Sequence, residues 1–317
     1  MSFSTDVKTE LASLKHLDCC NKAELSAIFH VGGSLERSSE GTTVLFQTTN
    51  IAVVRRVIGL LKQLYPDSAY TLIDKKQARF GKRDIFLFRI EPPADQILSD
   101  LSLTDTRGLF SHNIDKTLIR KECCRKAYLA GAFLAGGSIN NPDTATYHLE
   151  IQTFSKEEAE NLCELANGFG LNAKTAENRR GSIVYVKEAE KIADFLRVSG
   201  ATNSLFVFED NRIKRDFKNS INRVINCDIA NEKKAIEAAK KQLEYIEIIE
   251  KSRPNDLPEG IKQAIFLRKK YPESTLLELS YAAEEHFGYR ISKSALNHRF
   301  RAIKDFATQI QIEEGSA

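Results

Sequence analysis

The spacing of apolar residues changes several times along this chain, and each change predicts a new element. Apolar residues recur every three or four positions through 51–65 and stop at Pro66, which predicts a helix. Two runs rich in β-branched and aromatic residues, 69–74 and 84–90, lie on either side of Gly81 and predict strands. The other elements predicted in this first block are a helix through 25–33, a strand at 42–48 and a short helix at 97–103. With the strand that directly follows the first helix, the predicted order is α-β-β-α-β-β-α.

A second block repeats this order. Its predicted elements are a helix ending at Gly136, a strand at 146–153, a helix at 156–168, strands at 173–178 and 182–187, and a helix at 189–199. The polar stretch 102–120 connects the two blocks, and we expect its 115–121 portion to begin the next helix.

The two blocks are also related in sequence. Aligned without gaps, 18–34 and 122–138 share Cys-Cys, Lys, Ala, Leu, Phe, Gly-Gly and Ser, nine identities in seventeen positions. The similarity resumes at 46–49 and 151–154, shifted by one residue, so a whole supersecondary unit has been duplicated. Small residues would let the two copies' helices approach closely, which predicts a packing seam between two lobes. These residues are Ala27, Gly32, Gly33, Ala130, Gly131, Ala135, Gly136 and Gly137.

The last third of the chain is predicted to be helical. A charged segment, 212–226, precedes a helix at 231–252 that has one apolar face. Pro254 and Pro258 then mark a domain boundary, because proline interrupts helices.

Three short helices follow this boundary. They are expected from Pro258 to Tyr271, from Ser274 to Phe287 and from Lys293 to about Ala307. Gly288 can adopt the left-handed conformation that closes the second, and Ser292 is a good N-cap for the third. The spacing of the last two helices matches a helix-turn-helix.

These patterns together predict an α+β protein. Its expected parts are a first lobe at 1–105, a second lobe at 106–207, a basic helical connector at 208–253 and an all-α helix-turn-helix domain at 254–317.

Composition adds limits. The chain has 317 residues, 42% of them hydrophobic, and can bury a large core. No run of eighteen apolar residues occurs, and the first residues lack a basic region followed by an apolar stretch, so we expect a cytoplasmic protein. The net charge of +3 is small but unevenly distributed: 212–223 carries five basic residues against Asp216 alone, and 288–304 carries five against no acid.

The six cysteines offer no familiar metal motif. Cys19-Cys20 and Cys123-Cys124 occupy equivalent repeat positions, Cys163 and Cys227 stand alone, and no CxxC occurs. Adjacent cysteines do not easily face one tetrahedral zinc ion, so we interpret them as small, semi-buried residues in a reducing compartment. We likewise interpret His30 as a packed helix histidine, and we expect no cofactor and no metal.

The third helix of the terminal domain carries the candidate chemistry. Leu296, Phe300 and Ile303 would face inward, and the opposite face offers donors for hydrogen bonds. Asn and Arg can pair bidentately with adenine and guanine edges, whereas Lys, Ser and a helix N-terminus suit phosphates. The alternative is a solvated basic face, which the absence of acids disfavours. The candidate DNA-binding residues are Ser274, Arg290, Ser292, Lys293, Ser294, Asn297, His298, Arg299, Arg301 and Lys304.

The connector is a second candidate. Spacing of three and four places many of its basic and amide residues on one helical face, where they could contact phosphates. A charged helix that bridges two domains would look the same, so both interpretations stay open. The residues are Arg212, Lys214, Arg215, Lys218, Asn219, Asn222, Arg223 and Asn226.

The small-residue helices resemble the signature helices of the LAGLIDADG homing endonucleases, the second copy, 129–137, more closely than the first, 25–33. That resemblance implies two αββαββα lobes paired through these helices. The nucleases need a carboxylate at the eighth motif position to hold a divalent metal, and this chain has Gly32 and Gly136 there. The nearest acids, Glu36 and Asp143, lie in the following strand or loop, so cleavage by this mechanism is not expected.

Over essentially its whole length the chain resembles the WhiA family of bacterial transcription regulators, on the degenerate lobes, the 222–231 segment and the terminal helix-turn-helix. The resemblance implies a regulator of sporulation or cell-division genes that is not an enzyme. It implies double-stranded promoter DNA as partner, with another transcription factor or RNA polymerase as a further candidate. Two alternatives are a metal-dependent nuclease with relocated ligands and a protein-interaction scaffold.

Overall fold

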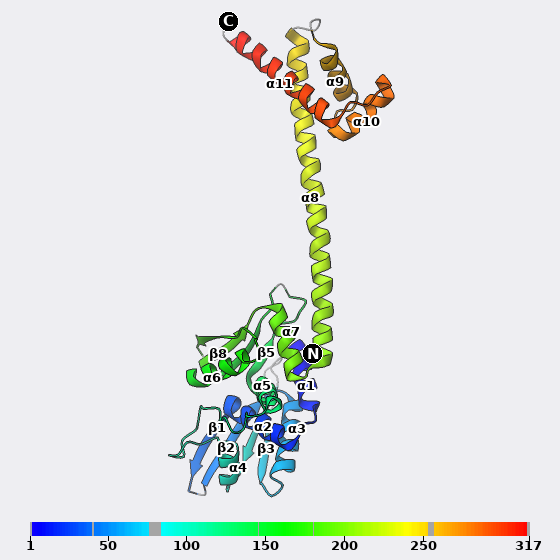
Figure 1. Cartoon of the computed structure of the whole chain (residues 1–317). Coiled ribbons are helices and arrows are strands. Elements are labelled where there is room, and N and C mark those ends of the chain that lie inside the picture. Colours follow the sequence, from blue (N-terminus) through cyan, green and yellow to red (C-terminus); the bar gives the residue numbers. More distant parts are fainter. Residues whose placement is uncertain are drawn as a thin grey trace. The chain divides into compact units, whose positions relative to one another are not determined.

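The structure, a computed structural model, describes residues 2–39, 41–75, 84–144, 146–179, 181–252 and 257–315 (Figure 1). It divides into two compact units, Met1–Arg215 and Asp216–Ala317. The first unit is α+β and the second is helical, as the sequence predicts. Each unit is described by itself.

The first lobe has the predicted α-β-β-α-β-β-α order. Its sheet is antiparallel with strand order β1-β2-β4-β3. The last helix of the lobe is short. It spans Asp95–Asp100 and so lies slightly earlier in the chain than the predicted 97–103. The elements are α2 (Asp18–Gly32), β1 (Gly33–Ser38), β2 (Gly41–Thr48), α3 (Ile51–Leu64), β3 (Tyr70–Lys75), β4 (Ile85–Ile90) and α4 (Asp95–Asp100).

The second lobe repeats this topology, with strand order β5-β6-β8-β7. Its elements are α5 (Glu122–Gly136), β5 (Gly137–Ile139), β6 (Leu149–Thr153), α6 (Lys156–Asn167), β7 (Lys174–Asn178), β8 (Gly181–Val186) and α7 (Ala189–Ser199). The identical strand order confirms that a whole supersecondary unit is duplicated.

One prediction about the connection between the lobes is wrong. Residues 115–121 are not helical: the chain turns at 116–119, and α5 begins only at Glu122. The Asp115 carboxylate accepts the backbone N–H of Thr117 at 2.7 Å and the hydroxyl of Ser102 at 2.8 Å. An aspartate that bonds to the backbone two residues on favours a turn over a helix.

A helix that the sequence analysis does not predict precedes the first lobe. This helix, α1 (Phe3–Ser13), buries Phe3, Val7 and Leu11, which recur every four residues. Such spacing places them on one helical face, and they join the core shared by the two lobes.

The seam between α2 and α5 depends on the small residues. A Cβ atom added to Gly131 of α5 would lie 2.3 Å from the carbonyl oxygen of Glu24 on α2, and one added to Gly136 would lie 2.8 Å from Cγ1 of Val31 on α2 and 2.3 Å from the carbonyl oxygen of Gln152 on β6. These contacts are shorter than van der Waals distance, so neither position tolerates a side chain without movement of backbone. The predicted packing seam is therefore confirmed, and both lobes share one hydrophobic core around it.

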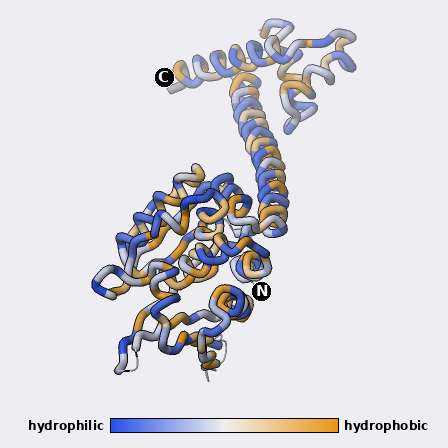
Figure 2. The backbone as a smooth tube through the Cα atoms, turned by 60° about the horizontal axis from the view of Figure 1, so that its bottom comes forward, coloured by the Kyte–Doolittle hydropathy of each residue, from blue (hydrophilic) through white to orange (hydrophobic). Residues whose placement is uncertain are grey.

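The segment predicted as two helices, 212–226 and 231–252, is part of one helix, α8 (Thr202–Ser252), 51 residues long. No proline or glycine lies within it, so nothing interrupts its backbone hydrogen bonds. In Figure 2 hydrophilic and hydrophobic residues alternate along its tube. Phe208 belongs to the core of the first unit, and Ile246 and Ile249 belong to the core of the second.

The second unit contains α9 (Glu259–Lys270), α10 (Leu276–Phe287) and α11 (Lys293–Gly315) packed with the end of α8. Thr275 and Glu278 form a capping box at α10, and Gly288 closes that helix with φ of 76°. The three predicted helices are present, although α11 continues past the expected end near Ala307. Of the proline linker, 253–256 lies outside the described residues. The predicted domain boundaries remain predictions.

Glu158 generates a test of the second lobe. This α6 side chain is 2% exposed, and neither carboxylate oxygen has a hydrogen-bond partner in the described part of the chain. Burial raises the pKa of Glu158 from 4.5 to about 8. The folded chain therefore keeps this proton when the unfolded chain has lost it, and stability falls as pH rises through that window, by roughly 1.4 kcal/mol per unit of pKa difference.

We expect Glu158→Gln to unfold at a higher temperature than the parent near pH 8 but not near pH 5, since the amide cannot ionise. Thermal unfolding followed by circular dichroism across this range measures the difference. Glu157→Gln, at an exposed position of the same helix, is the control. If the difference in unfolding temperature between Glu158→Gln and the parent did not change with pH, the raised pKa of Glu158 would be contradicted.

Candidate nucleic-acid interface

The exposed face of α11 is the strongest candidate surface. Ser292 caps the helix, because its Oγ accepts the backbone N–H of Ala295 at 3.2 Å. Leu296, Phe300 and Ile303 are buried in the core of the second unit. Helical spacing gathers the other side into one solvent-facing arc. The exposed candidates on it are Lys293, Ser294, Asn297, His298, Arg301 and Lys304.

The remaining candidates of this domain do not lie on that arc. Arg299 is half-buried, and its Nη1 donates to Oε1 of Gln263 on α9 at 3.0 Å. Arg290 lies 4.2 Å over the ring of Tyr281 and donates to the Ser280 hydroxyl at 3.2 Å. Ser274 precedes α10. The structure thus brings six of the ten candidates together, while Arg299 holds two helices of the domain against each other.

Arg268, on α9, is the residue that sequence reasoning missed. Its side chain is 1% exposed, and burial lowers its pKa to about 10. It donates to the carbonyl oxygen of Ser274 at 2.5 Å and to Oε1 of Gln242 at 2.9 Å, and its guanidinium lies 5.3 Å from the ring centroid of Phe300. Arg268 therefore ties α8, the start of α10 and the buried side of α11 together. Because Arg268 is one basic residue among several in this stretch of the chain, nothing in the sequence indicates that its side chain is buried.

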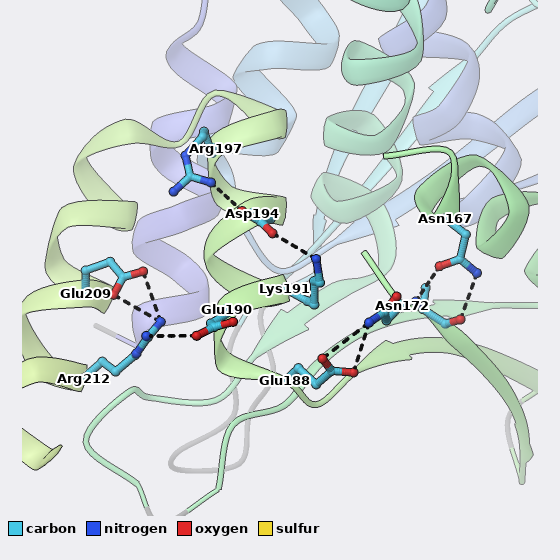
Figure 3. A network of polar contacts seen from close by, with 10 residues as sticks. Asn167, Asn172, Glu188, Glu190, Lys191, Asp194, Arg197, Glu209 and Arg212 are labelled. Carbon is cyan, nitrogen blue, oxygen red and sulfur yellow. Dashed lines mark hydrogen bonds and ion pairs between the residues drawn. The ribbon is translucent and has the colours of Figure 1, made fainter. Parts of the chain in front are cut away.

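The candidates of the basic connector separate into two groups. Arg212 forms ion pairs with Glu209 at 3.4 Å and with Glu190 of α7 at 3.5 Å (Figure 3). Arg215 donates to the carbonyl oxygen of Thr144 at 2.6 Å, and its guanidinium lies 3.9 Å from the ring centroid of Tyr147. These two arginines bind the start of α8 to the second lobe. The others are exposed: Lys214, Lys218, Asn219, Asn222, Arg223 and Asn226.

The ends of the signature helices offer no carboxylate. A Cβ atom at Gly32 would lie 2.7 Å from the ring of Phe46, so an aspartate there does not fit the present packing. A cavity of about 750 Å³ opens beside Gly32, lined largely by apolar side chains such as Leu45, Leu87 and Phe110. Glu36 lies in β1, where it pairs with Arg89 at 3.8 Å. Asp143 lies in the loop after β5.

His30 is packed, as the sequence interpretation expects. It is 1% exposed, and burial lowers its pKa to about 4, so the ring is neutral. Nδ1 lies 3.1 Å from the Ser26 hydroxyl, and Nε2 lies 3.2 Å from the carbonyl oxygen of Ser102. The ring thus joins α2 to the connection between the lobes.

Among the described helices, none has the length and apolar character needed to cross a membrane.

Comparisons with known proteins follow the same division of the chain. Residues 18–104 match the family model of the WhiA N-terminal LAGLIDADG-like domain, 125–218 match the WhiA LAGLIDADG-like domain, and 221–307 match the WhiA C-terminal HTH domain. Two relatives named "Probable cell division protein WhiA", from Bacillus cereus (strain AH187) and Bacillus anthracis (strain CDC 684 / NRRL 3495), are each 45% identical over 315 residues, which is 99% of this chain and 98% of theirs.

Two solved structures share the fold. The full-length DUF199/WhiA of Thermatoga maritima matches with a TM-score of 0.58 at 22% identity, covering 98% of this chain and 99% of that one. The N-terminal LAGLIDADG domain of DUF199/WhiA matches with a TM-score of 0.51 at 25% identity, covering 63% and 90%.

The position of Arg268 generates a prediction for the second unit. Arg268→Ala leaves buried acceptors unpaired and opens a void beside Phe300, so we expect a loss of about 2–4 kcal/mol in unfolding free energy. Lys269→Ala, which removes an exposed ion pair with Glu250, is the control, with an expected cost below about 1 kcal/mol. Urea unfolding of both variants compares them, and equal costs would show that Arg268 does not organise the domain.

Proposed function

The chain belongs to the WhiA family, and from this premise we propose that it is a sequence-specific, DNA-binding regulator of transcription of the sporulation and cell-division type. The observation that carries the proposal is the exposed arc of α11 in a helix-turn-helix domain. Within 288–304 no acidic residue opposes the approach of a polyanion.

The chemistry of this arc suits base readout flanked by phosphate contacts. Asn297 and Arg301 lie one helical turn apart and are both exposed, so they can address neighbouring base edges in a major groove. Lys293 and Ser294 lie at the N-terminus of α11, where backbone N–H groups also favour a phosphate. Lys304 extends the arc by another turn. We assign base recognition to Asn297 and Arg301, and phosphate contacts to the others.

The basic connector adds affinity without sequence preference. Because Arg212 and Arg215 are engaged with the second lobe, phosphate contacts fall to the exposed part of the set, Lys214, Lys218, Asn219, Asn222, Arg223 and Asn226. The lobes act as a scaffold and as a surface for a protein partner, with another transcription factor or RNA polymerase as candidates. A DNA-binding regulator of this type acts in the cytoplasm, at the nucleoid.

The competing proposal, an active nuclease, has little support in the site. Metal-dependent hydrolysis of DNA needs carboxylates near the scissile phosphate, and the two signature helices end in glycines packed against Phe46 and the backbone of Gln152. The acids nearest in sequence lie elsewhere, in β1 and in the loop after β5. We therefore propose that the chain does not cleave DNA.

Base recognition by α11 is tested on a promoter fragment recovered by genome-wide pull-down with the purified chain. We expect Asn297→Ala and Arg301→Ala each to weaken promoter binding by roughly 1–3 kcal/mol, and binding to random DNA much less, because bidentate base contacts carry specificity. Gel-shift titration of both DNAs gives the ratio. If both variants keep the parent's preference for the promoter, the sequence reader lies outside α11.

Phosphate contact by the connector predicts a different signature. Lys218→Ala and Arg223→Ala should weaken binding to promoter and random DNA alike, and each should reduce the slope of log affinity against log salt by about 1. Lys240→Ala changes the charge equally on an exposed position of α8 outside the basic segment. If Lys240→Ala weakened DNA binding as much as Lys218→Ala and Arg223→Ala do, the loss would come from the change in net charge and not from lost phosphate contacts.

The absence of cleavage is tested with supercoiled and promoter DNA in the presence of Mg²⁺ or Mn²⁺. We expect no nicks above those given by a Glu36→Gln, Asp143→Asn double variant. Metal-dependent cuts that disappear in this variant would revive the nuclease with relocated ligands.

A further inference from the structure

Four cysteines meet at one end of the seam between the lobes. Cys19 and Cys20 lie in the first turn of α2, and Cys123 and Cys124 lie at the equivalent positions of α5. The two helices run in the same direction, with their N-terminal ends together. Gly131 of α5 lies against Glu24 of α2, and nearer the C-terminal ends of both helices Gly136 lies beside Val31. The duplicated Cys-Cys pairs are therefore brought face to face.

The sulfur atoms have the spacing of a tetrahedral site. All four Sγ atoms lie within 4.8 Å of one another, and those of Cys19 and Cys20 are 4.0 Å apart. Four thiolates at about 2.3 Å from a zinc ion stand about 3.8 Å from each other. Contraction of the longer separations by up to about an ångström would complete such a shell. Within the described residues, this is the one group of three or more His, Cys, Asp or Glu side chains close enough to hold a metal.

The sequence interpretation, that adjacent cysteines do not easily face one zinc ion, overlooked the helix. Side chains of a helix tilt toward its N-terminus, so two neighbours in the first turn both reach past the helix end. Two cysteines supply only two of the four ligands of a tetrahedral zinc ion, so each pair needs a second pair opposite it. The pseudo-symmetry of the lobes supplies that pair, from a position far away in the sequence.

We propose that one zinc ion is bound in a tetrathiolate site by Cys19, Cys20, Cys123 and Cys124, and that this site joins the two lobes. On binding, each thiol transfers its proton to solvent and each sulfur donates an electron pair to the metal, with no change in oxidation state. Cys123 is exposed and offers the ion a path from solvent, while Cys20 and Cys124 are buried.

The surroundings suit a group of thiolates. The site would carry a net negative charge, and it lies at the N-termini of two helices, whose dipoles favour negative charge there. Neither helix has a capping side chain there, since the N-cap positions are Leu17 and Lys121.

Two interlobe disulfides are the competing chemistry for these four sulfurs. A disulfide bond brings two sulfur atoms to about 2.05 Å from each other, and it requires no contact between these atoms and the other pair. The mutual proximity of all four, within 4.8 Å, favours a shared central ligand instead. A reduced cluster of four thiols without metal is the remaining outcome.

The test uses the full-length chain purified without chelator. Elemental analysis by mass spectrometry should find one zinc ion per chain. Replacement by Co²⁺ should give the visible absorption of a four-coordinate ion together with a near-ultraviolet thiolate-to-cobalt charge-transfer band. The cobalt spectrum needs no substitution and so does not depend on a variant that folds.

Variants then locate the ion. Cys20→Ser with Cys124→Ser should lose zinc and the cobalt bands, whereas Cys163→Ser with Cys227→Ser, which alters the two cysteines outside the cluster, should keep both. Circular dichroism verifies that each double variant is folded. Removal of zinc by a chelator should lower the unfolding temperature of the parent and of the Cys163, Cys227 variant.

Three results would overturn the proposal. The first is a folded parent chain without zinc, with no charge-transfer band on addition of Co²⁺, and with six reactive thiols after denaturation. The second is the same chain with four of its thiols blocked until a reductant is added, which would identify disulfides. The third is zinc that remains bound when Cys20 and Cys124 are replaced, which would place the ion elsewhere.

Discussion

The close approach of α2 and α5 is the constraint on which the first unit depends. At Gly131 the two backbones are so near that a single added carbon would lie 2.3 Å from the carbonyl oxygen of Glu24. Only small residues permit this contact, and the contact in turn lets both lobes bury one continuous core. The two four-stranded sheets are equivalent because each is built onto one of these helices.

The same pairing gives the two ends of the seam different chemistry. At the C-terminal ends, Gly32 and Gly136 occupy positions where a metal-dependent nuclease of this fold needs carboxylates, and apolar side chains surround a cavity there. At the N-terminal ends, two pairs of cysteines converge. In this chain the end of the seam with Gly32 and Gly136 therefore has no metal-binding side chains on its two helices, and the metal site that we propose lies at the other end.

In the second unit, a buried charge takes the place of a small-residue seam. Arg268 satisfies the carbonyl oxygen before α10 and an amide on α8 while its guanidinium lies over Phe300 of α11. Burying an arginine is costly unless its N–H groups are paired, so the arrangement specifies one packing of the helices. The inward side of α11 is held by this packing, which leaves Asn297 and Arg301 on the solvent side.

The sequence by itself determined the duplication, the element order of each lobe, the helix-turn-helix and the outward arc of α11. These features follow from local periods, such as Leu296, Phe300 and Ile303 on one helical face and Gly288 at a helix end. Only the tertiary structure decided which basic residues are free: Arg212, Arg215 and Arg299 bind other parts of the protein, and Arg268 is buried. Only it gathered the four cysteines. Spacing along a helix reports which face a residue occupies, whereas its partner depends on a second element whose position no local pattern encodes.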